Sequence, residues 1–491
     1  MSYYLNQNQT PLFTALKEHS QKKVIPFDVP GHKQGRGLKE FTDFVGTTVM
    51  ELDVNSMKSV DNICNPIGVI KEAKELAAYA FGSDHAYFLV NGTTSGVQAM
   101  IMSACEPGDK IILPRNAHKS AIAGLILAGA LPIYIQPEID ENLGIAMGVS
   151  VESVVNIIGR HPDAKAIFLI NPTYYGATSD IKEIIHIARR NGIAVLVDEA
   201  HGAHLNFHEG FPMSAMELGA DMSAVSTHKT GGSLTQSSIL LLKEGAIDPY
   251  TVKKNLNLMQ TTSGSYLLMA SIDVARKQLA TEGEEIFTRV LKLVRNARAQ
   301  INKVDGLYAF GTELVGNPGV YDFDESKLGV NVRKLGLTGF EVYDILIDEY
   351  NIQVELADYY NILAIVSVGD EEEQVTALVE ALKDIAEKHR RPEEIKVISN
   401  VLKNPDAIVS PRDAYYSSKK VVNIEDAEGE ISGESIMAYP PGIPIVSPGE
   451  RITKDMIDHI KLLKEEETLI QGTEDPYAEQ VRVLGQGNGK G

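Results

Sequence analysis

The chain has 491 residues, of which 44% are hydrophobic, enough for more than one domain with a buried core. Its net charge of −20 at pH 7, with no basic stretch to offset it, argues against nucleic-acid binding. The cysteines, Cys64 and Cys105, lack metal-ligand or redox spacing, which predicts a reducing, cytoplasmic environment. The longest uncharged run, Ser120–Pro137, is interrupted by Pro132, and no signal-peptide pattern opens the chain, so no membrane association is expected.

Residues 1–64 are predicted to form an N-terminal arm and an interface loop. A short helix is expected around Leu12–His19, and the prolines and glycines of Pro26–Gly35 predict a fixed loop after it. The long segment Glu51–Pro66 is polar but carries regularly placed apolar residues, which favours a functional loop over a disordered one. We expect this arm to pack on another subunit or domain.

From residue 65 to about residue 290, helices and strands alternate, which predicts a large α/β domain with a mostly parallel sheet covered on both faces. The expected helices are Ile67–Phe81, Thr94–Cys105, Lys119–Ala128, Val151–Arg160 and Ile181–Asn191, and the expected strands are His85–Val90, Lys110–Leu113, Pro132–Ile135, Ala166–Ile170, Ala194–Val197 and Met222–Ser226.

The rest of the chain is predicted to form two smaller domains. A long helix at Ala270–Val304 leads into a small α/β domain at residues 291–395. Residues 396–491 are predicted to be a C-terminal α+β domain that ends in a flexible, glycine-rich tail from Gly485.

Segments at the ends of the predicted strands carry complementary chemistry. Lys229 closes Ser226-Thr-His-Lys229, and a lysine that is partly desolvated there has a lowered pKa and becomes nucleophilic. Asp198 follows the apolar run Ile193–Val197, where a carboxylate can hold a proton on a heterocyclic nitrogen. Asn91–Gly96 opens a helix with hydroxyls and free backbone N–H groups, which favours phosphate. Together they match the requirements of pyridoxal 5′-phosphate.

The order of these and other motifs resembles that of the Orn/Lys/Arg decarboxylase family, from about residue 10 to about residue 470. The resemblance implies the aspartate aminotransferase fold (fold type I), and the length is similar to that of the shorter arginine decarboxylases. The segments that carry it are Pro30–Gly35, Asn91–Thr93, Arg115–Ser120, Asp198–Gly202, Ser226–Lys229 and Tyr439–Pro444.

The resemblance also implies roles for single residues. Lys229 would bond the cofactor, Asp198 would pair with its ring nitrogen, and His118 would stack on its ring, with His228 as a further catalytic residue. The positions that resemble cofactor contacts are Thr93, Thr94, Ser95, His118, Asp198, His201, Ser226, His228, Lys229 and Thr262. Thr262 would reach the phosphate of the other subunit, which implies a homodimer with shared active sites; larger assemblies remain open.

Several residues have alternative interpretations. His118 could simply cap the helix that begins at Lys119. Glu434 and Asp413 are candidates for binding a substrate cation, but ordinary surface acids would have the same pattern. His201 stands near the position where the larger relatives carry a tryptophan. The histidines around it do not predict a metal site, because they follow a strand end and no H-E-x-x-H pattern or cysteine accompanies them.

The implied reaction is decarboxylation of a basic amino acid, with L-arginine to agmatine and CO2, in polyamine biosynthesis, as the first expectation. Lysine and ornithine, which would give cadaverine and putrescine, remain open. An aminotransferase or aldolase-type lyase on the same fold would need an arginine clamp, for which Arg333 and Arg412 are candidates. The third alternative is a cofactor-binding regulator without turnover. Such a protein would be expected to lack the complete lysine–aspartate–phosphate set or to carry a DNA-binding module, and the sequence meets neither condition.

Overall fold

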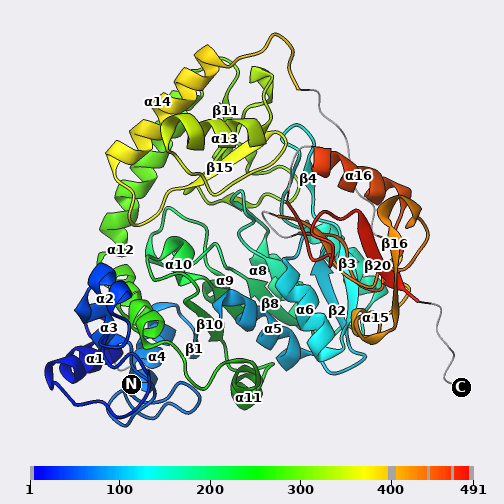
Figure 1. Ribbon diagram of the computed structural model, residues 1–491. Coiled ribbons are helices and arrows are strands. Elements are labelled where there is room, and N and C mark those ends of the chain that lie inside the picture. Colours follow the sequence, from blue (N-terminus) through cyan, green and yellow to red (C-terminus); the bar gives the residue numbers. More distant parts are fainter. Residues whose placement is uncertain (1–4, 396–404, 440–442, 466–468, 486–491) are drawn as a thin grey trace, which may run out of the picture. The chain divides into compact units, whose positions relative to one another are not determined.

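The computed structural model describes residues 5–395, 405–439, 443–465 and 469–485 (Figure 1). The chain forms two compact units: the first comprises Met1–Ser103, Val197–Arg289 and Ser367–Gly369, and the second comprises Ala104–Leu196, Val290–Val366 and Asp370–Gly491. The main sheet has seven strands in the order β1-β10-β9-β8-β6-β2-β3. The α/β character that the sequence predicts is confirmed.

In the first unit, β1 (His85–Leu89), β10 (Ser238–Leu242) and β9 (Met222–Val225) pair antiparallel. Strand β10 is not among the predicted strands, because Ser233–Ser238 has the composition of a polar turn. Its Ser-Ile-Leu-Leu-Leu sequence is buried throughout, so the run is a central strand that reverses direction after the Lys229 turn.

Two further helices of this unit flank β1. The expected helix after residue 66 is confirmed as α4 (Val69–Ala80), and α5 (Gly92–Ala104) begins directly after the strand. The carboxylate of Asp61 accepts hydrogen bonds from the backbone N–H groups of Gly68 (2.8 Å) and Ile70 (3.2 Å) and so caps α4. The loop that was predicted to be functional therefore has a structural role at this residue.

The N-terminal arm contains α1 (Pro11–Gln21), α2 (Lys39–Val45) and α3 (Thr47–Leu52), of which only the first was predicted. A buried ion pair on α12 (Tyr266–Ile301) anchors it: Arg276 Nη2 lies 2.7 Å from Asp273 Oδ1. Asp273 Oδ2 accepts from Leu12 N–H at 3.0 Å, and Arg276 donates to Gln9 O at 2.6 Å. The start of α1 is thus held by charges from the core of the unit.

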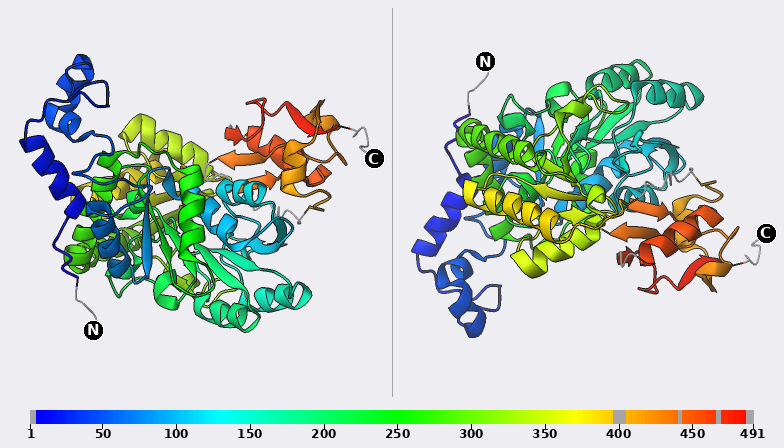
Figure 2. Two further views of the ribbon diagram at one scale, coloured as in Figure 1. Left: turned by 90° about the horizontal axis from the view of Figure 1, so that it is seen from below. Right: turned by 90° about the horizontal axis from the view of Figure 1, so that it is seen from above.

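In the second unit, β6 (Ala166–Ile170), β2 (Lys110–Pro114) and β3 (Leu131–Ile135) are parallel, as predicted. A separate four-stranded antiparallel sheet has the order β11-β13-β15-β14. Helix α13 (Gly339–Tyr350) lies beside α14 (Glu372–Lys388) and contacts this sheet (Figure 2). The strands of this sheet are β11 (Tyr308–Ala309), β13 (Lys327–Asn331), β14 (Leu356–Ala357) and β15 (Asn361–Ile365).

Helices α6 (Lys119–Ala128), α7 (Val151–Arg160) and α8 (Ile181–Arg190) also belong to the second unit and occur where the apolar spacing predicts them. Shorter elements of the two units were not predicted individually. They are β4 (Ile139–Asp140), β5 (Ile145–Ala146), β7 (Ala177–Thr178), α9 (Ala215–Leu218) and α11 (Pro249–Met259). Strand β12 (Asp322–Phe323) lies within the segment Gly319–Phe323, where the sequence does predict an element.

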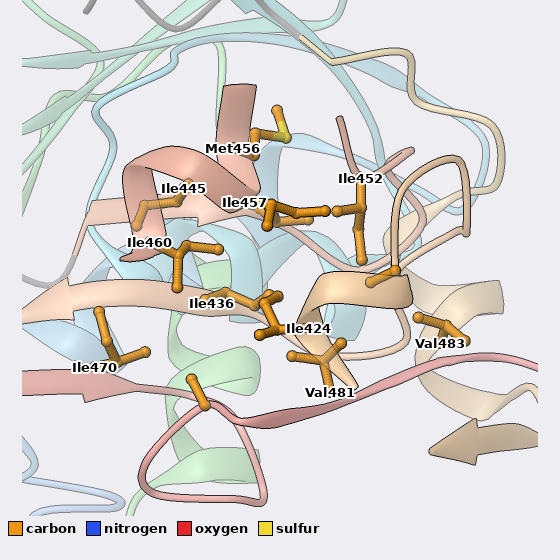
Figure 3. Packing of buried hydrophobic residues seen from close by; sticks show 13 residues of the cluster. Ile424, Ile436, Ile445, Ile452, Met456, Ile457, Ile460, Ile470, Val481 and Val483 are labelled. Carbon is orange, nitrogen blue, oxygen red and sulfur yellow. The ribbon is translucent and has the colours of Figure 1, made fainter. Parts of the chain in front are cut away.

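The last part of the second unit has its own apolar core, formed by isoleucines, valines and a methionine from strands and a helix (Figure 3). Ile436, Ile445 and Ile452 point toward Ile457 and Ile460 of α16 in this core. Its elements are α15 (Pro411–Tyr416), β16 (Lys419–Asn423), β17 (Ile436–Tyr439), β18 (Ile443–Val446), α16 (Lys454–Glu465), β19 (Leu469–Gln471) and β20 (Gln480–Leu484). Most of the predicted glycine-rich tail lies outside the described residues.

Candidate active site

Lys229 lies on a single helical turn, α10 (Thr227–Thr230), that follows β9. Its backbone N–H donates to Ser226 O at 3.0 Å, so the segment predicted as a tight turn is one turn of helix. Gly232 then reverses the chain at φ +86°, and a Cβ there would lie 2.9 Å from Val368 Cγ2. Both the backbone angle and the contact require glycine at this position.

The amine of Lys229 contacts His201, which lies just beyond the end of β8 (Ala194–Asp198). Lys229 Nζ and His201 Nε2 are 2.8 Å apart, and the imidazole is buried. His201 was predicted among the cofactor contacts, and the structure brings it to Lys229, 28 residues away in sequence. An imidazole at hydrogen-bond distance can exchange a proton with an amine.

Asp198 closes β8 as a buried carboxylate. Its Oδ1 accepts from Ala200 N–H at 3.1 Å. Burial raises the pKa of Asp198, while the charge of Lys229 acts in the opposite direction. The sequence prediction that a carboxylate stands at the end of a buried strand is confirmed, and its proximity to the lysine is an outcome of the fold.

Glu199, the next residue, was not singled out from the sequence. Its carboxylate accepts from Ala215 N–H and from Ser223 Oγ, both at 2.7 Å, and burial raises its pKa to about 8. These contacts occupy it with the start of α9 and with β9. Glu199 lies just beyond β8, and these two hydrogen bonds already engage both of its carboxylate oxygens.

A group of buried hydroxyls surrounds the start of α5. Thr93 Oγ1 hydrogen-bonds Ser226 Oγ and lies 3.0 Å from Ser238 Oγ. Ser95 is buried and donates to Gly92 O at 2.9 Å, whereas the predicted Thr94 is exposed. Ser238 was missed because it lies on the unpredicted strand β10.

The other predicted residues of the first unit have different surroundings. His228 Nδ1 lies 2.8 Å from Ser237 O, which fixes its ring against the chain that leads into β10. Thr262 lies in an exposed turn before α12. Nearby, Tyr266 donates its hydroxyl to Asp61 O at 2.6 Å, so the predicted interface loop contacts this turn region within one chain.

The remaining candidates belong to the second unit, where each has a structural contact. His118 Nδ1 accepts from Ser120 N–H at 3.2 Å and caps α6, the alternative considered from the sequence. Glu434 accepts from Arg482 N–H at 2.8 Å, and the exposed Asp413 pairs with Ser410 at the start of α15. In the motif Tyr439–Pro444, residues 440–442 lie outside the described residues.

The two arginines proposed for an aminotransferase-type clamp also have local contacts. Arg412 Nη1 donates to Leu127 O at 3.4 Å, and Arg333 Nη1 to Ile395 O at 3.5 Å. Within the described residues, no group of three or more His, Cys, Asp or Glu side chains could hold a metal ion. No helix in the described part of the chain is long and apolar enough to cross a membrane.

The residues of the first unit fit pyridoxal phosphate. The backbone N–H groups and hydroxyls at the start of α5 suit a phosphate, because a helix N-terminus carries partial positive charge. Asp198 is buried, which raises its pKa, and a protonated ring nitrogen would stabilise its ionised form. Lys229 stands beside an imidazole that can accept its proton.

The fold is similar to that of solved structures. The lysine decarboxylase of Francisella novicida aligns with a TM-score of 0.83 and 22% identity, over 97% of this chain and 81% of the other. An alanine–glyoxylate aminotransferase from Nostoc sp. aligns with a TM-score of 0.52 and 19% identity, over 64% and 86%. The fold is therefore the α/β fold of the fold-type I, pyridoxal phosphate-dependent enzymes.

The chain belongs to the Orn/Lys/Arg decarboxylase family. The family's major domain matches residues 10–329, and its C-terminal domain matches residues 396–476. An arginine decarboxylase of Bacillus anthracis is 45% identical over 485 residues, 98% of each chain. An arginine decarboxylase of Bacillus subtilis is 44% identical over 483 residues, 98% of this chain and 99% of the other. A lysine decarboxylase of Pseudomonas aeruginosa is 25% identical and matches over 78% of its own length.

Proposed function

We propose that this protein converts L-arginine to agmatine and CO2 with pyridoxal phosphate as cofactor, in the cytoplasm. The observation that carries the proposal is the pairing of Lys229 with His201 next to the buried Asp198, in a chain that is 45% identical to an arginine decarboxylase over 98% of its length. Lysine and ornithine decarboxylation are the second candidates, because the same site chemistry would serve them.

Each residue of the site has a proposed task. The cofactor, when bound, supplies an electron sink for the pair of electrons left by CO2. Asp198 would hold a proton on the ring nitrogen, and the hydroxyls of Thr93 and Ser226, which hydrogen-bond each other, would bind the phosphate. Lys229 would hold the cofactor, and its Nζ would be the proton donor to the substrate α-carbon.

Two histidines complete the proposed site. His201 Nε2, 2.8 Å from Lys229 Nζ, returns a proton to that amine. His118 would stack on the cofactor ring and limit its movement, while His228 fixes the segment that carries the lysine through its contact with Ser237 O. Glu434 and Asp413 remain proposed ligands of the distal cation of the substrate, since a guanidinium pairs with carboxylates.

The substrate is tested by offering L-arginine, L-lysine and L-ornithine separately to the protein loaded with pyridoxal phosphate. We expect kcat/KM for CO2 release to be highest with arginine, by about 10²-fold or more. Carboxylates that bind the planar guanidinium of arginine would be left imperfectly paired by the shorter side-chain ammonium of lysine or ornithine. Amine products are identified by mass, and heat-denatured protein is the control. A keto acid or aldehyde as the main product would contradict decarboxylation.

We also propose a homodimer, in which Thr262 of the partner subunit reaches the phosphate. Support comes from the arm of the first unit, where large apolar side chains of residues 24–49 are exposed, among them Phe27 (94%) and Phe44 (92%). A concentration of exposed aromatic and aliphatic side chains on one segment is typical of an interface. The sequence predicts that this arm packs on another subunit or domain, and a second copy of the chain is the partner we propose for it.

Substituting both aromatic residues tests the dimer. The variant Phe27→Ser/Phe44→Ser is expected to shift the protein from dimer to monomer at micromolar concentration, measured by light scattering, because obligate interfaces depend on apolar area. The control is Tyr477→Ser, an equally large side chain that is 73% exposed in the second unit. The proposal is wrong if the arm variant keeps the mass of the unmodified protein.

A further inference from the structure

A buried ion pair joins the loop before α6 to the C-terminal part of the second unit. Arg115 directly follows β2, and its guanidinium binds both carboxylate oxygens of Glu450, with Nη2 2.9 Å from Oε2. The Arg115 and Glu450 side chains are only 11% and 2% exposed. A bidentate, charge-assisted pair of this kind fixes the direction of both groups as well as their distance.

Glu450 is held rigidly on its own side. Its Oε2 accepts from Ser447 N–H at 2.7 Å, and its backbone oxygen accepts from Ser432 N–H at 2.8 Å. Arg115 also donates from Nη2 to Ile445 O at 2.8 Å. Ile445 and Ile452, which flank this turn, belong to the apolar core of the C-terminal part (Figure 3). The carboxylate of Glu450 is therefore held in a turn that is anchored on both sides by the apolar core.

On the other side, little chain separates Arg115 from His118. Ala117 N–H donates to Pro114 O at 3.1 Å, which closes a tight turn, and Arg115 N–H donates to Ile135 O at 3.0 Å. His118 then begins α6 as its cap. Only Asn116 and Ala117 separate the two residues, and the backbone hydrogen bond of Ala117 holds them in one short turn.

The C-terminal part also contacts the opposite end of α6. Arg412 of α15 donates to Leu127 O, and a Cβ on Gly129, the left-handed residue that ends α6, would lie 2.9 Å from Arg412 Nη1. The C-terminal part thus contacts the chain near both ends of α6.

We propose that Glu450 is a positioning residue for His118, acting through Arg115, and that this is one task of the C-terminal domain. The inference rests on the proposed function, in which the His118 ring stacks on the cofactor. If the carboxylate of Glu450 is made neutral, Arg115 becomes a buried cation without its anion. We expect its guanidinium to move toward water and to displace the turn formed by residues 115–118. A shift of about 1 Å in a positioning group can lower the rate by about 10²-fold.

The test compares Glu450→Gln with Glu325→Gln. Glu325 is a suitable control because it is also buried, also pairs with an arginine (Oε1 is 2.6 Å from Arg295 Nη2) and lies in the same unit. In the cofactor-free protein, Glu450→Gln is expected to speed hydrogen exchange in peptides covering residues 115–121, and Glu325→Gln to leave them unchanged. In the loaded protein, Glu450→Gln should change the circular dichroism of the bound cofactor and lower kcat more than it raises KM.

A double variant decides whether the effect passes through His118. In a His118→Ala background, Glu450→Gln should produce no further change in the cofactor signal, because coupled residues are not additive. If Glu450→Gln does not fold, Glu450→Asp, which keeps the charge but shortens its reach, replaces it in each comparison.

The outcomes separate this inference from the proposed function. Unchanged exchange at 115–121 in Glu450→Gln, an equal effect in Glu325→Gln, or full additivity with His118→Ala would overturn the positioning role. Failure of the unmodified enzyme to release CO2 from any basic amino acid would overturn the proposed function, while the exchange measurement needs neither cofactor nor substrate.

Discussion

Replacing Lys229 by alanine is expected to abolish both the absorbance of lysine-bound cofactor and all turnover. The reason is covalent: Lys229 is the amine at the end of β9 that the fold brings beside His201 and Asp198, and alanine cannot form the bond to the cofactor aldehyde. The measurement is the visible absorbance spectrum after loading, together with CO2 release. We expect a rate at the level of the protein-free reaction.

The control is Lys254→Ala, which removes an exposed lysine of the same unit and should leave spectrum and rate intact. Borohydride reduction of the loaded, unmodified protein should label Lys229. A stable label on any other lysine would show that the cofactor is bonded elsewhere.

Changing Asp198 to asparagine is expected to preserve cofactor binding but to lower kcat by at least about 10²–10³-fold. An amide has the same shape as the carboxylate but no charge, so it cannot keep the ring nitrogen protonated. Burial makes the difference large, because a charge that lies out of water interacts strongly with its partner. Retention of binding is checked by the absorbance of the loaded protein, and kcat by CO2 release at saturating substrate.

Glu199→Gln is the matched control, since it makes the same substitution at the adjacent buried acid. With its pKa raised to about 8, Glu199 is largely protonated at pH 7, so a neutral glutamine resembles its resting state. Its partner Ser223 can rotate its hydroxyl to accept a hydrogen bond instead of donating one. Near-normal kcat in Asp198→Asn, or an equal loss of kcat in Glu199→Gln, would show that Asp198 is not the specific partner of the ring nitrogen.

The sequence alone predicted the groups of the proposed site and determined most of the elements beside them. Lys229, Asp198 and Thr93 each follow an apolar run, and in α/β proteins the carboxyl ends of such strands are where ligands bind. Helices α6 and α7 were also predicted with the bounds they have, because apolar spacing and the residues at their ends are local signals.

Only the tertiary structure decided which of these groups meet. The contact of His201 with Lys229 joins residues on successive loops, and the Arg115–Glu450 pair joins residues 335 apart in sequence. Strand β10, which begins at Ser238, forms because it pairs antiparallel with β1 on one side and with β9 on the other. Its five residues show no alternation of apolar and polar side chains that would predict a strand from the sequence. Periodicity reports which face of an element is buried, whereas the partner on that face is set by the packing of distant segments.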